Sequence, residues 1–528
     1  MLNILNEPII RTATSGGSRG AAPLPEVYAM LMADAVDAFP ALRPHQRHAW
    51  HAFLVQLGAM AIYRTELTEP PGDAVEWLRI IRALTPDYPD DEPWQLVVDD
   101  IIKPAFMQPP ASSAEREKDY KSVVATPDEL DMLVTSKNHD LKAAVATQAA
   151  PDEWLFALVT LQTMEGFSGA GNYGISRMNG GLGSRTAFSL TPSERLGAHI
   201  RRDITALLES RSTLMDEYQM SDCGADLLWT LPWDGTPVER LLLNHLDPFY
   251  IEVCRRIRLR SDAGGRLLAI RTSSKAARIA GKDLKGRTGD PWVPINTKRD
   301  GLPLTLAAGG FTYKRVTDYL TSEDWQWPHL LRPLPAEQRS AQPMYLVARG
   351  MVRGQGKTEG YHERIIRLRP KTVGSAMVRR TTAMDDLGRI ARERIEQVGA
   401  IQRILSHAIQ VFAARGDGDK VSPEHRSLAR PWLNRLDEFV DMDFFDGLQK
   451  EFEADDAERQ TTRNTWLMNG TDGVIDHARR TLHAAEDSLP CPAIHHYRAR
   501  VNAEGLFEGR IRGAKGLPFL FDEGQEEN

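Results

Sequence analysis

The spacing of apolar residues changes near residue 376, and this change constrains the fold more than any single motif. Three later segments repeat apolar side chains at three- and four-residue spacing, as amphipathic helices do: residues 385–414, 433–452 and 466–485. Short breaks at 416–423 and around Gly470 suit antiparallel neighbours. Residues 376–528 are therefore predicted to form a four-helix-type bundle, with Trp432 and Trp466 in its core.

The preceding residues 1–375 have a different texture, in which short apolar runs alternate with Gly- and Pro-rich stretches. A helical patch at 45–61 interrupts this pattern, and residues 267–271 and 344–348 are candidate strands. Residues 155–164 form an apolar run long enough to be a buried helix instead. The sequence thus predicts an α+β fold, with a large mixed N-terminal domain followed by the helical bundle.

Charge and cysteine content exclude several classes of protein. The 65 Lys and Arg residues face 72 Asp and Glu, a net charge of −7, so a nucleic-acid partner would need locally concentrated positive charge. Cys223, Cys254 and Cys491 are far apart and lack CxxC spacing, which argues against a disulfide framework or a cysteine zinc site. With no export signal and no membrane-spanning run of ~18–20 apolar residues, we expect a cytoplasmic protein.

The most unusual stretch is rich in glycine and covers residues 166–174 and 179–183. Small residues let a backbone approach a partner closely, with amide N–H groups free to face phosphates or groove acceptors. The spacing does not match a dinucleotide-binding fingerprint. A flexible connection or tight turn is the alternative interpretation. The binding candidates are Gly166, Phe167, Ser168, Gly169, Ala170, Gly171 and Asn172.

Positive charge is concentrated between Arg349 and Arg380, where nine basic residues face two acidic ones, a local net charge of +7. Such segregated charge is what contact with phosphates requires. A solvated surface stripe or the rim of a domain interface is the alternative. The basic residues are Arg349, Arg353, Lys357, Arg364, Arg367, Arg369, Lys371, Arg379 and Arg380.

Within this stretch, Gly356-Lys357-Thr358 ends like a phosphate-binding P-loop, but the register is wrong. The pattern needs a glycine five positions before Gly356, where this chain has Met351. An NTPase is therefore disfavoured. Gln355 instead lies between Gly354 and Gly356 at a predicted loop tip, where Arg353 and Lys357 can hold phosphates while the glutamine enters a groove or displaces a base.

Several segments together resemble CasA, the family of large subunits of the type I-E CRISPR Cascade complex. They are residues 104–108 (Pro-Ala-Phe-Met-Gln), 136–140 (Ser-Lys-Asn-His-Asp), 166–169 (Gly-Phe-Ser-Gly), and Gly350 with Gln355, all preceding a helical bundle. The resemblance implies a non-catalytic DNA-binding subunit that recognises the motif flanking a DNA target (the PAM) through the minor groove, where readout is degenerate.

By the same resemblance, residues 166–172 would lie against the minor groove and Gln355 would be the wedge that starts strand separation and R-loop formation, with Arg353 and Gly354 as its neighbours. A basic residue from another loop would also reach the groove. Its candidates, among which the sequence does not decide, are Lys275, Arg278 and Lys282, in the stretch before Gly289-Asp290-Pro291-Trp292. Trp292 is a candidate support for the binding loop.

The resemblance also implies the partners. The segment Ser136, Lys137, Asn138, His139 and Asp140 would hold the 5′ end of the guide crRNA and anchor the subunit. The helical bundle would contact the small subunits and the opened double-stranded target DNA, beside backbone and 5′-handle subunits, and a recruited helicase-nuclease would cut. No cofactor is implied.

Three other interpretations remain in view. His139-Asp140 resembles a fragment of an HD metal site, without recognisable partner motifs. His495 and His496 beside Cys491 have zinc-ligand side chains, although surface residues explain them equally. An RNA-binding scaffold, or the large subunit of another CRISPR effector subtype without a PAM-reading role, is the alternative function.

Overall fold

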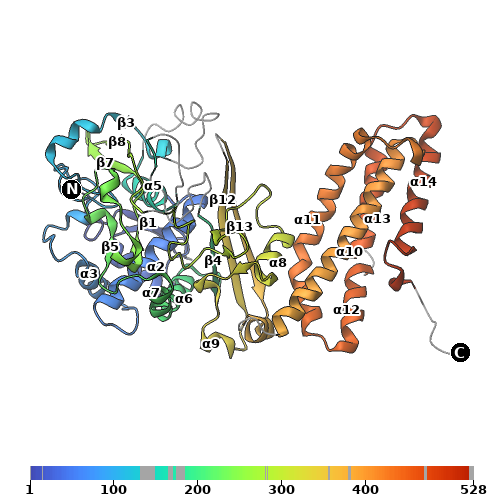
Figure 1. Ribbon diagram of the computed structural model, residues 1–528, viewed down its shortest axis with the longest axis horizontal. Coiled ribbons are helices and arrows are strands. Elements are labelled where there is room, and N and C mark those ends of the chain that lie inside the picture. Colours follow the sequence, from blue (N-terminus) through green and yellow to red (C-terminus); the bar gives the residue numbers. More distant parts are fainter. Residues whose placement is uncertain are drawn as a thin grey trace. The chain divides into compact units, whose positions relative to one another are not determined.

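The computed structural model divides the chain into two compact units. The first comprises residues 1–311, 323–336 and 342–367, and the second comprises 312–322, 337–341 and 368–528. The residues that the structure describes are 2–14, 16–130, 149–164, 171–173, 185–279, 281, 283–354, 357–377, 382–468 and 473–521. Figure 1 colours them along the chain.

The first unit is built around one deeply buried helix, α2 (Arg47–Arg64). Apolar residues occur on all its sides, and nearly every side chain from His48 to Ile62 is buried, as expected of a helix surrounded by its domain. It packs against α3 (Ala74–Arg82), α5 (Pro151–Met164) and α6 (Leu196–Glu209). The remaining helices of this unit are α1 (Leu24–Met32), α7 (Arg211–Tyr218) and α9 (Pro335–Gln338), the last shared with the second unit.

The strands of the first unit form small sheets rather than one large one. Three of the described sheets have three strands each, and two of these have the orders β13-β12-β4 and β3-β8-β7. Their bounds are β3 (Ser122–Val124), β4 (Ala187–Thr191), β7 (Arg256–Ser261), β8 (Leu267–Thr272), β12 (Met344–Gly354) and β13 (Lys357–Leu368). The remaining described strands are β1 (Ile10–Ala13), β2 (Arg19–Ala22), β5 (Ala225–Leu227), β6 (Leu246–Ile251), β9 (Ile295–Asn296), β10 (Leu302–Pro303) and β11 (Trp325–Gln326), and the third such sheet has the order β10-β9-β11.

The second unit is helical, and long helices lie alongside one another in it (Figure 1). Helix α10 (Thr382–Ala413) packs against α11 (Pro423–Glu453), α13 (Val474–Ser488) and α14 (Ala493–Arg512). Two further helices are α8 (Tyr313–Thr321) and α12 (Asp456–Met468). Gly416 lies in the turn that follows α10 and has φ +80. A Cβ there would lie 2.9 Å from the Ala499 Cα, so this turn requires glycine.

These elements confirm the predicted α+β fold with a helical C-terminal part. Strands cover 267–271 and 344–348, and the buried run at 155–164 is helical. The predicted core positions of two tryptophans are wrong, because Trp432 and Trp466 are half-buried. Trp466 still contacts the buried Arg394 and Phe444 with part of its ring.

Candidate nucleic-acid interface

Strands β12 and β13 position the predicted Gln355 tip. They are neighbours in the sheet, and β12 ends at Gly354 while β13 begins at Lys357. Gln355 and Gly356, which lie outside the described residues, are the two residues that join them. So short a connection cannot cross over the sheet, so the strands form an antiparallel hairpin. Arg353 is half-buried near the end of β12, just before this connection.

Strand β4 links the glycine-rich segment to the same sheet. The segment lies between α5 and β4 in the sequence, and β4 pairs antiparallel with β12. Ala187 lies opposite Arg349, and Thr191 lies opposite Tyr345. The chain therefore enters β4 at the end of the sheet toward which β12 runs as it approaches Gly354. The described residues that follow the glycine-rich segment and those that precede Gln355 share one end of one sheet.

The described part of the glycine-rich segment contacts the stretch that carries the basic candidates. Asn172 forms an isolated parallel bridge with Ser274, whose backbone N–H donates to the Gly171 carbonyl at 2.8 Å. Gly171 has φ +82, and a Cβ there would approach the Ser273 Cβ to 2.9 Å. Only glycine permits this approach. The next residue, Lys275, is exposed, so glycine segment and basic side chain are adjacent.

The three basic candidates have different surroundings. Lys275 is exposed, and its backbone N–H donates to the Gly235 carbonyl. Arg278 is 3 % exposed, donates to the Leu231 carbonyl at 2.9 Å and has its Cζ 5.4 Å from the Trp233 ring centroid. Burial lowers the pKa of its guanidinium. Lys282 lies outside the described residues. Of the two candidates that the structure describes, Lys275 is exposed and Arg278 is buried.

A buried ion pair fixes the start of β4. The Arg185 Nε lies 2.5 Å from Asp290 Oδ2, its Nη1 lies 3.6 Å from Glu252 Oε1, and its Cζ lies 5.2 Å from the Trp292 ring. The Trp292 carbonyl accepts from the Phe188 N–H at 3.0 Å. Asp290 and Trp292 thus hold the chain where it leaves the glycine-rich segment. Sequence reasoning noted Trp292 but missed Arg185, although an isolated Arg next to glycines was visible.

Partners distant in sequence neutralise part of the basic stretch. Arg349 Nε lies 2.8 Å from Glu363 Oε2, across the hairpin. Burial alone would raise the pKa of Glu363, but Arg349, Tyr361 and Arg47 together outweigh it and the pKa is lowered. Arg369 pairs with Asp446 at 3.0 Å and with Glu453 at 3.1 Å inside the second unit. Glu363 is already counted in the local charge of +7, whereas Asp446 and Glu453 are not, so these two lower the charge that a phosphate would meet.

Other predicted residues fall outside the described part of the chain. These are Gly166, Phe167, Ser168, Gly169 and Ala170 of the glycine-rich segment, and the whole predicted guide segment Ser136, Lys137, Asn138, His139 and Asp140. The side chains of Gly354 and Lys357 are also not described. The roles assigned to all of these residues stay predictions.

Sequence reasoning missed a buried cluster on α2 and α6. His51 Nε2 lies 2.8 Å and His199 Nε2 lies 3.3 Å from Asp203 Oδ2, and the Ser189 hydroxyl lies 2.7 Å from His199 Nε2. Burial lowers the pKa of His199 to about 3. Burial alone would raise the pKa of Asp203, but contacts with the two histidines hold it well below its ordinary value. The sequence feature that could have indicated this cluster is the spacing of His199 and Asp203, which lie four residues apart on one helix.

A second cluster of metal-ligand type joins α13 and α14. The ligand atoms of His483, Glu486 and Glu504 lie within 4.8 Å of one another. Arg500 contacts both carboxylates, with its Nε 3.2 Å from Glu486 and 3.0 Å from Glu504, and so supplies the positive charge that balances them. The group of Cys491, His495 and His496 is not among the ligand clusters of the described residues.

All three cysteines, Cys223, Cys254 and Cys491, are free. Among the described helices, none combines the length and the apolar character needed to cross a bilayer.

Comparisons with known proteins identify the fold. No protein-family model matches the sequence, and no curated protein matches it either. Solved structures match over nearly the whole chain. CasA from Thermus thermophilus superposes with a TM-score of 0.64 at 14 % identity, covering 97 % of this chain and 99 % of that one.

Two further solved structures agree with it. Cse1 from Acidimicrobium ferrooxidans gives a TM-score of 0.62 at 15 % identity, covering 97 % of this chain and 98 % of its own. Cse1 from Thermobifida fusca gives 0.62 at 14 % identity, with 97 % of each chain covered. These structural matches show that this chain has the CasA (Cse1) fold over 97 % of its length.

Proposed function

We propose that this chain is the large, non-catalytic subunit of a type I-E CRISPR surveillance complex, and that it reads the motif flanking a DNA target. The observation that carries the proposal is the convergence of three predicted segments. The glycine-rich segment, the hairpin that bears Gln355 and the stretch that bears Lys275 are joined through β4, β12 and the Asn172–Ser274 bridge. The CasA fold supports the same assignment.

The motif is read from the minor groove. Residues 166–172 present a backbone of small residues to the groove floor, and Lys275 meets the phosphates or the groove edge beside them. The minor groove mainly distinguishes A·T from G·C pairs, so recognition by backbone and one basic side chain tolerates several related motifs. Positive charge at this site also makes binding sensitive to salt.

Gln355 acts as a wedge at the start of R-loop formation. Inserting a side chain between base steps costs a few kcal/mol, which phosphate contacts by Arg353 and Lys357 offset. Pairing of guide and target then proceeds nearly in balance with the duplex it replaces, so the wedge matters most at nucleation. A hairpin suits this role because its two strands are neighbours in the sheet on either side of the connection that carries Gln355.

The remaining roles follow from the family resemblance. Residues 136–140 hold the 5′ end of the guide crRNA and anchor the subunit on its neighbours. The helical unit contacts the small subunits and the opened DNA, and a recruited helicase-nuclease cuts the target in the cytoplasm. The chain itself performs no catalysis and needs no cofactor in this scheme.

The wedge is tested in the assembled complex with Gln355→Ala. The variant is expected to slow opening of a cognate duplex by about 10-fold while binding a target that is already melted at the flank as well as the parent does. Gln460→Ala, which replaces a glutamine on α12, is the matched control and leaves both substrates unaffected. Opening is followed by fluorescence of a base analogue beside the motif.

Equal losses on duplex and pre-melted targets would contradict the wedge. Unchanged motif preference when both Gln355 and Lys275 are replaced would favour the alternative function, an RNA-binding scaffold or a large subunit of another CRISPR effector subtype without a motif-reading role.

A further inference from the structure

The backbone around Lys275 is held by hydrogen bonds, although the lysine itself is exposed. The Ser274 N–H donates to the Gly171 carbonyl at 2.8 Å. The N–H groups of Lys275 and Ala276 both donate to the Gly235 carbonyl, at 2.8 and 3.2 Å. Three consecutive amides are thus bonded to two glycines, so a partner that meets this lysine has only a side chain left to order.

Gly235 approaches this stretch as closely as Gly171 does. It has φ +77, and a Cβ there would lie 2.9 Å from both the Cα and the Cβ of Ser274. Because one of these atoms belongs to the backbone, any side chain at position 235 would displace Ser274 and with it Lys275. The approach therefore requires glycine, as the approach of Gly171 to Ser273 does.

Two acidic side chains hold the turn that carries Gly235. Glu239 accepts from the N–H groups of Asp234 and Thr236 at 2.6 and 2.7 Å. It also accepts from the Thr236 hydroxyl at 2.8 Å. The Asp234 carboxylate accepts from the Ser112 N–H at 3.2 Å and from the Ser112 hydroxyl. The turn is therefore tied to a segment that lies more than a hundred residues earlier in the chain.

Residues 234–241, which we call the clasp, also hold the chain beyond Lys275. The Leu241 N–H donates to the Arg278 carbonyl at 2.7 Å. Leu241 also forms an isolated parallel bridge with Ile279. Contacts from the clasp thus reach the lysine and the residues that follow it.

The acidic groups of the clasp are used within the first unit. The Asp234 side chain is 6 % exposed, and its Oδ2 lies 3.3 Å from the Arg116 Nε, which balances its charge. Both oxygens of Glu239 accept hydrogen bonds from the clasp itself. The clasp therefore orders the backbone of Lys275 through neutral amide bonds and directs its carboxylates elsewhere.

We propose that the clasp is a positioning element for Lys275. It fixes the lysine backbone beside the glycine-rich segment before DNA binds, so that both meet the minor groove as one surface. Such pre-organisation raises affinity because less conformational freedom is lost on binding. The inference rests on the proposed function, since it requires Lys275 to contact the duplex, and Gly235 acts only through that lysine.

The test places Gly235→Ala in the assembled complex, alone and together with Lys275→Ala. Gly235→Ala alone is expected to weaken binding of a motif-bearing duplex by about 3- to 10-fold, because the lysine stretch must then be ordered on binding. In the Lys275→Ala background the same change is expected to have no further effect. Filter binding at one salt concentration measures the four affinities.

Gly265→Ala is the matched control. Gly265 lies in the exposed turn between β7 and β8 and has φ +79, close to the value of Gly235. Among the described residues, no heavy atom comes within 4 Å of a Cβ at Gly265. The control therefore carries the same backbone strain without the contact to Ser274, and it is expected to keep the affinity of the parent.

Hydrogen exchange in the full chain tests the clasp without DNA. The Lys275 and Ala276 amides are expected to exchange at least about 10-fold faster in Gly235→Ala than in the parent or in Gly265→Ala. Unchanged exchange in the buried helix α2 shows that the unit stays folded. If Gly235→Ala does not fold, Glu239→Gln, which removes one acceptor oxygen from the clasp, is expected to give the same pattern with smaller changes.

Equal losses of affinity from Gly235→Ala with and without Lys275 would show that the clasp is merely structural and would overturn the proposal. Unchanged exchange at Lys275 and Ala276 would overturn it as well. If Lys275→Ala itself leaves binding unchanged, the proposed groove contact fails and the positioning role fails with it. Weaker binding in Lys275→Ala but not in Gly235→Ala refutes the positioning role alone.

Discussion

Each unit of the molecule buries a group of three charged side chains, and the two groups have opposite composition. In the first unit one cation, Arg185, lies between Asp290 and Glu252. In the second unit one anion, Glu451, lies between Arg394 and Arg463, whose Nε is 2.7 Å from Glu451 Oε1. The three side chains of the first group are at most 4 % exposed, and Arg394 and Glu451 are fully buried.

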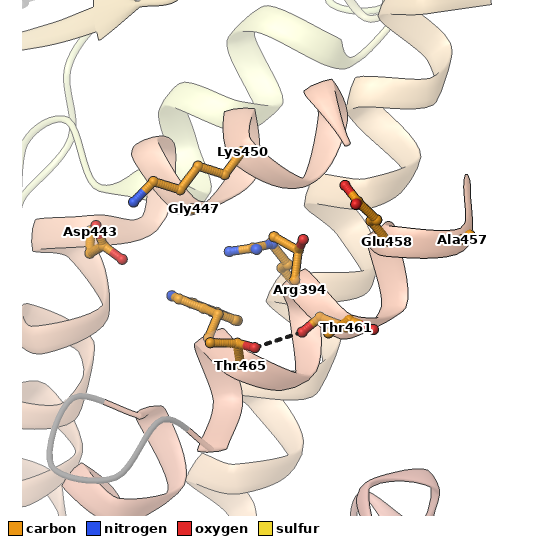
Figure 2. A pocket seen from close by; sticks show the side chains of 10 residues that line it. Arg394, Asp443, Gly447, Lys450, Ala457, Glu458, Thr461 and Thr465 are labelled. Carbon is orange, nitrogen blue, oxygen red and sulfur yellow. Dashed lines mark hydrogen bonds between the residues drawn. The ribbon is translucent and has the colours of Figure 1, made fainter. Parts of the chain in front are cut away.

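The difference shows how the two units use buried charge. The first group holds a chain segment in place, because Arg185 lies two residues after Gly183, the last residue of the glycine-rich segment. The second group joins α10, α11 and α12 and leaves two buried nitrogens of Arg394 (Figure 2) without a hydrogen-bond partner among the described residues. Buried ion pairs contribute little net stability but are expensive to break. The first group is therefore expected to be intolerant of change, and the second to be more tolerant, because Glu451 keeps a second basic partner, Arg463, when Arg394 is replaced.

The largest predicted effect comes from removing the central cation of the first group. Arg185→Met leaves two buried carboxylates without that cation, and it is expected to lower the free energy of unfolding by about 3–5 kcal/mol. Arg394→Met leaves Glu451 with Arg463, so the expected loss is about 1–3 kcal/mol. Denaturant unfolding measures both, and hydrogen exchange assigns each loss to its unit.

Arg389→Met is the matched control, since Arg389 is 48 % exposed and pairs with Asp386 on the helix surface. Its expected cost is below about 1 kcal/mol. A loss in Arg394→Met as large as that in Arg185→Met would show that the two groups are equally intolerant.

The second prediction sharpens the comparison through pH. Burial, followed by the neighbouring Glu504, raises the pKa of Glu486 in the second unit to about 8. The unfolded chain ionises this group near its ordinary pKa of 4.5, so folding loses stability as pH rises from there to about 8. Glu486→Gln removes this loss. Relative to the parent, the variant is expected to be more stable at pH 8 than at pH 5, by denaturant unfolding.

Glu217 in the first unit provides the opposite case. A hydrogen bond with His329 lowers its pKa to about 2, so its contribution is present above the unfolded value of 4.5 and disappears as pH falls toward 2. Glu217→Gln is therefore expected to cost stability at pH 7 and little at pH 2.5. The same pH response in both variants would remove the contrast between the units.

The smallest predicted effect concerns Lys275. In the assembled complex, Lys275→Ala is expected to reduce the slope of log affinity against log salt by about 0.9, the value for one phosphate contact. Lys420→Ala, an exposed lysine of the helical unit paired with Asp417, is the control and should leave the slope unchanged. Filter binding of a motif-bearing duplex at several salt concentrations measures it. An unchanged slope in Lys275→Ala would remove Lys275 from the interface.

Most of the fold was predictable because its signals are local. Three- and four-residue spacing located α10 and α11, and short apolar runs located β8 and β12. Residues 466–485 held part of two helices, with the predicted break near Gly470 between them. The prediction for Trp466 was wrong because a large aromatic residue on an amphipathic helix is expected to be buried in the core, whereas this one borders a cavity.

The site was predictable only in part, because pairing across long sequence separations leaves no local trace. The local net charge suggested a strongly basic stretch, yet Asp446 and Glu453, about 80 residues away in the sequence, pair with Arg369 and neutralise some of it. In the sequence, Arg278 and Lys275 were equal candidates for the basic residue, but in the structure Arg278 is buried and Lys275 is exposed. The burial and pairing of Arg394 could not be predicted from its sequence neighbours, since its partner Glu451 is 57 residues away.

The pairing in this sheet determines how far the β12–β13 hairpin extends beyond β4. Strand β4 begins at Ala187, opposite Arg349, whereas β12 continues for five residues to Gly354 with β13 as its companion. The hairpin therefore projects roughly 17 Å past its third strand. Lengthening the hairpin by one residue on each strand would move the side chains at its end to the opposite face of the sheet. Adding two residues to each strand would keep them on the same face. In the proposed function, the number of residue pairs in the hairpin would set how deeply Gln355 enters a duplex.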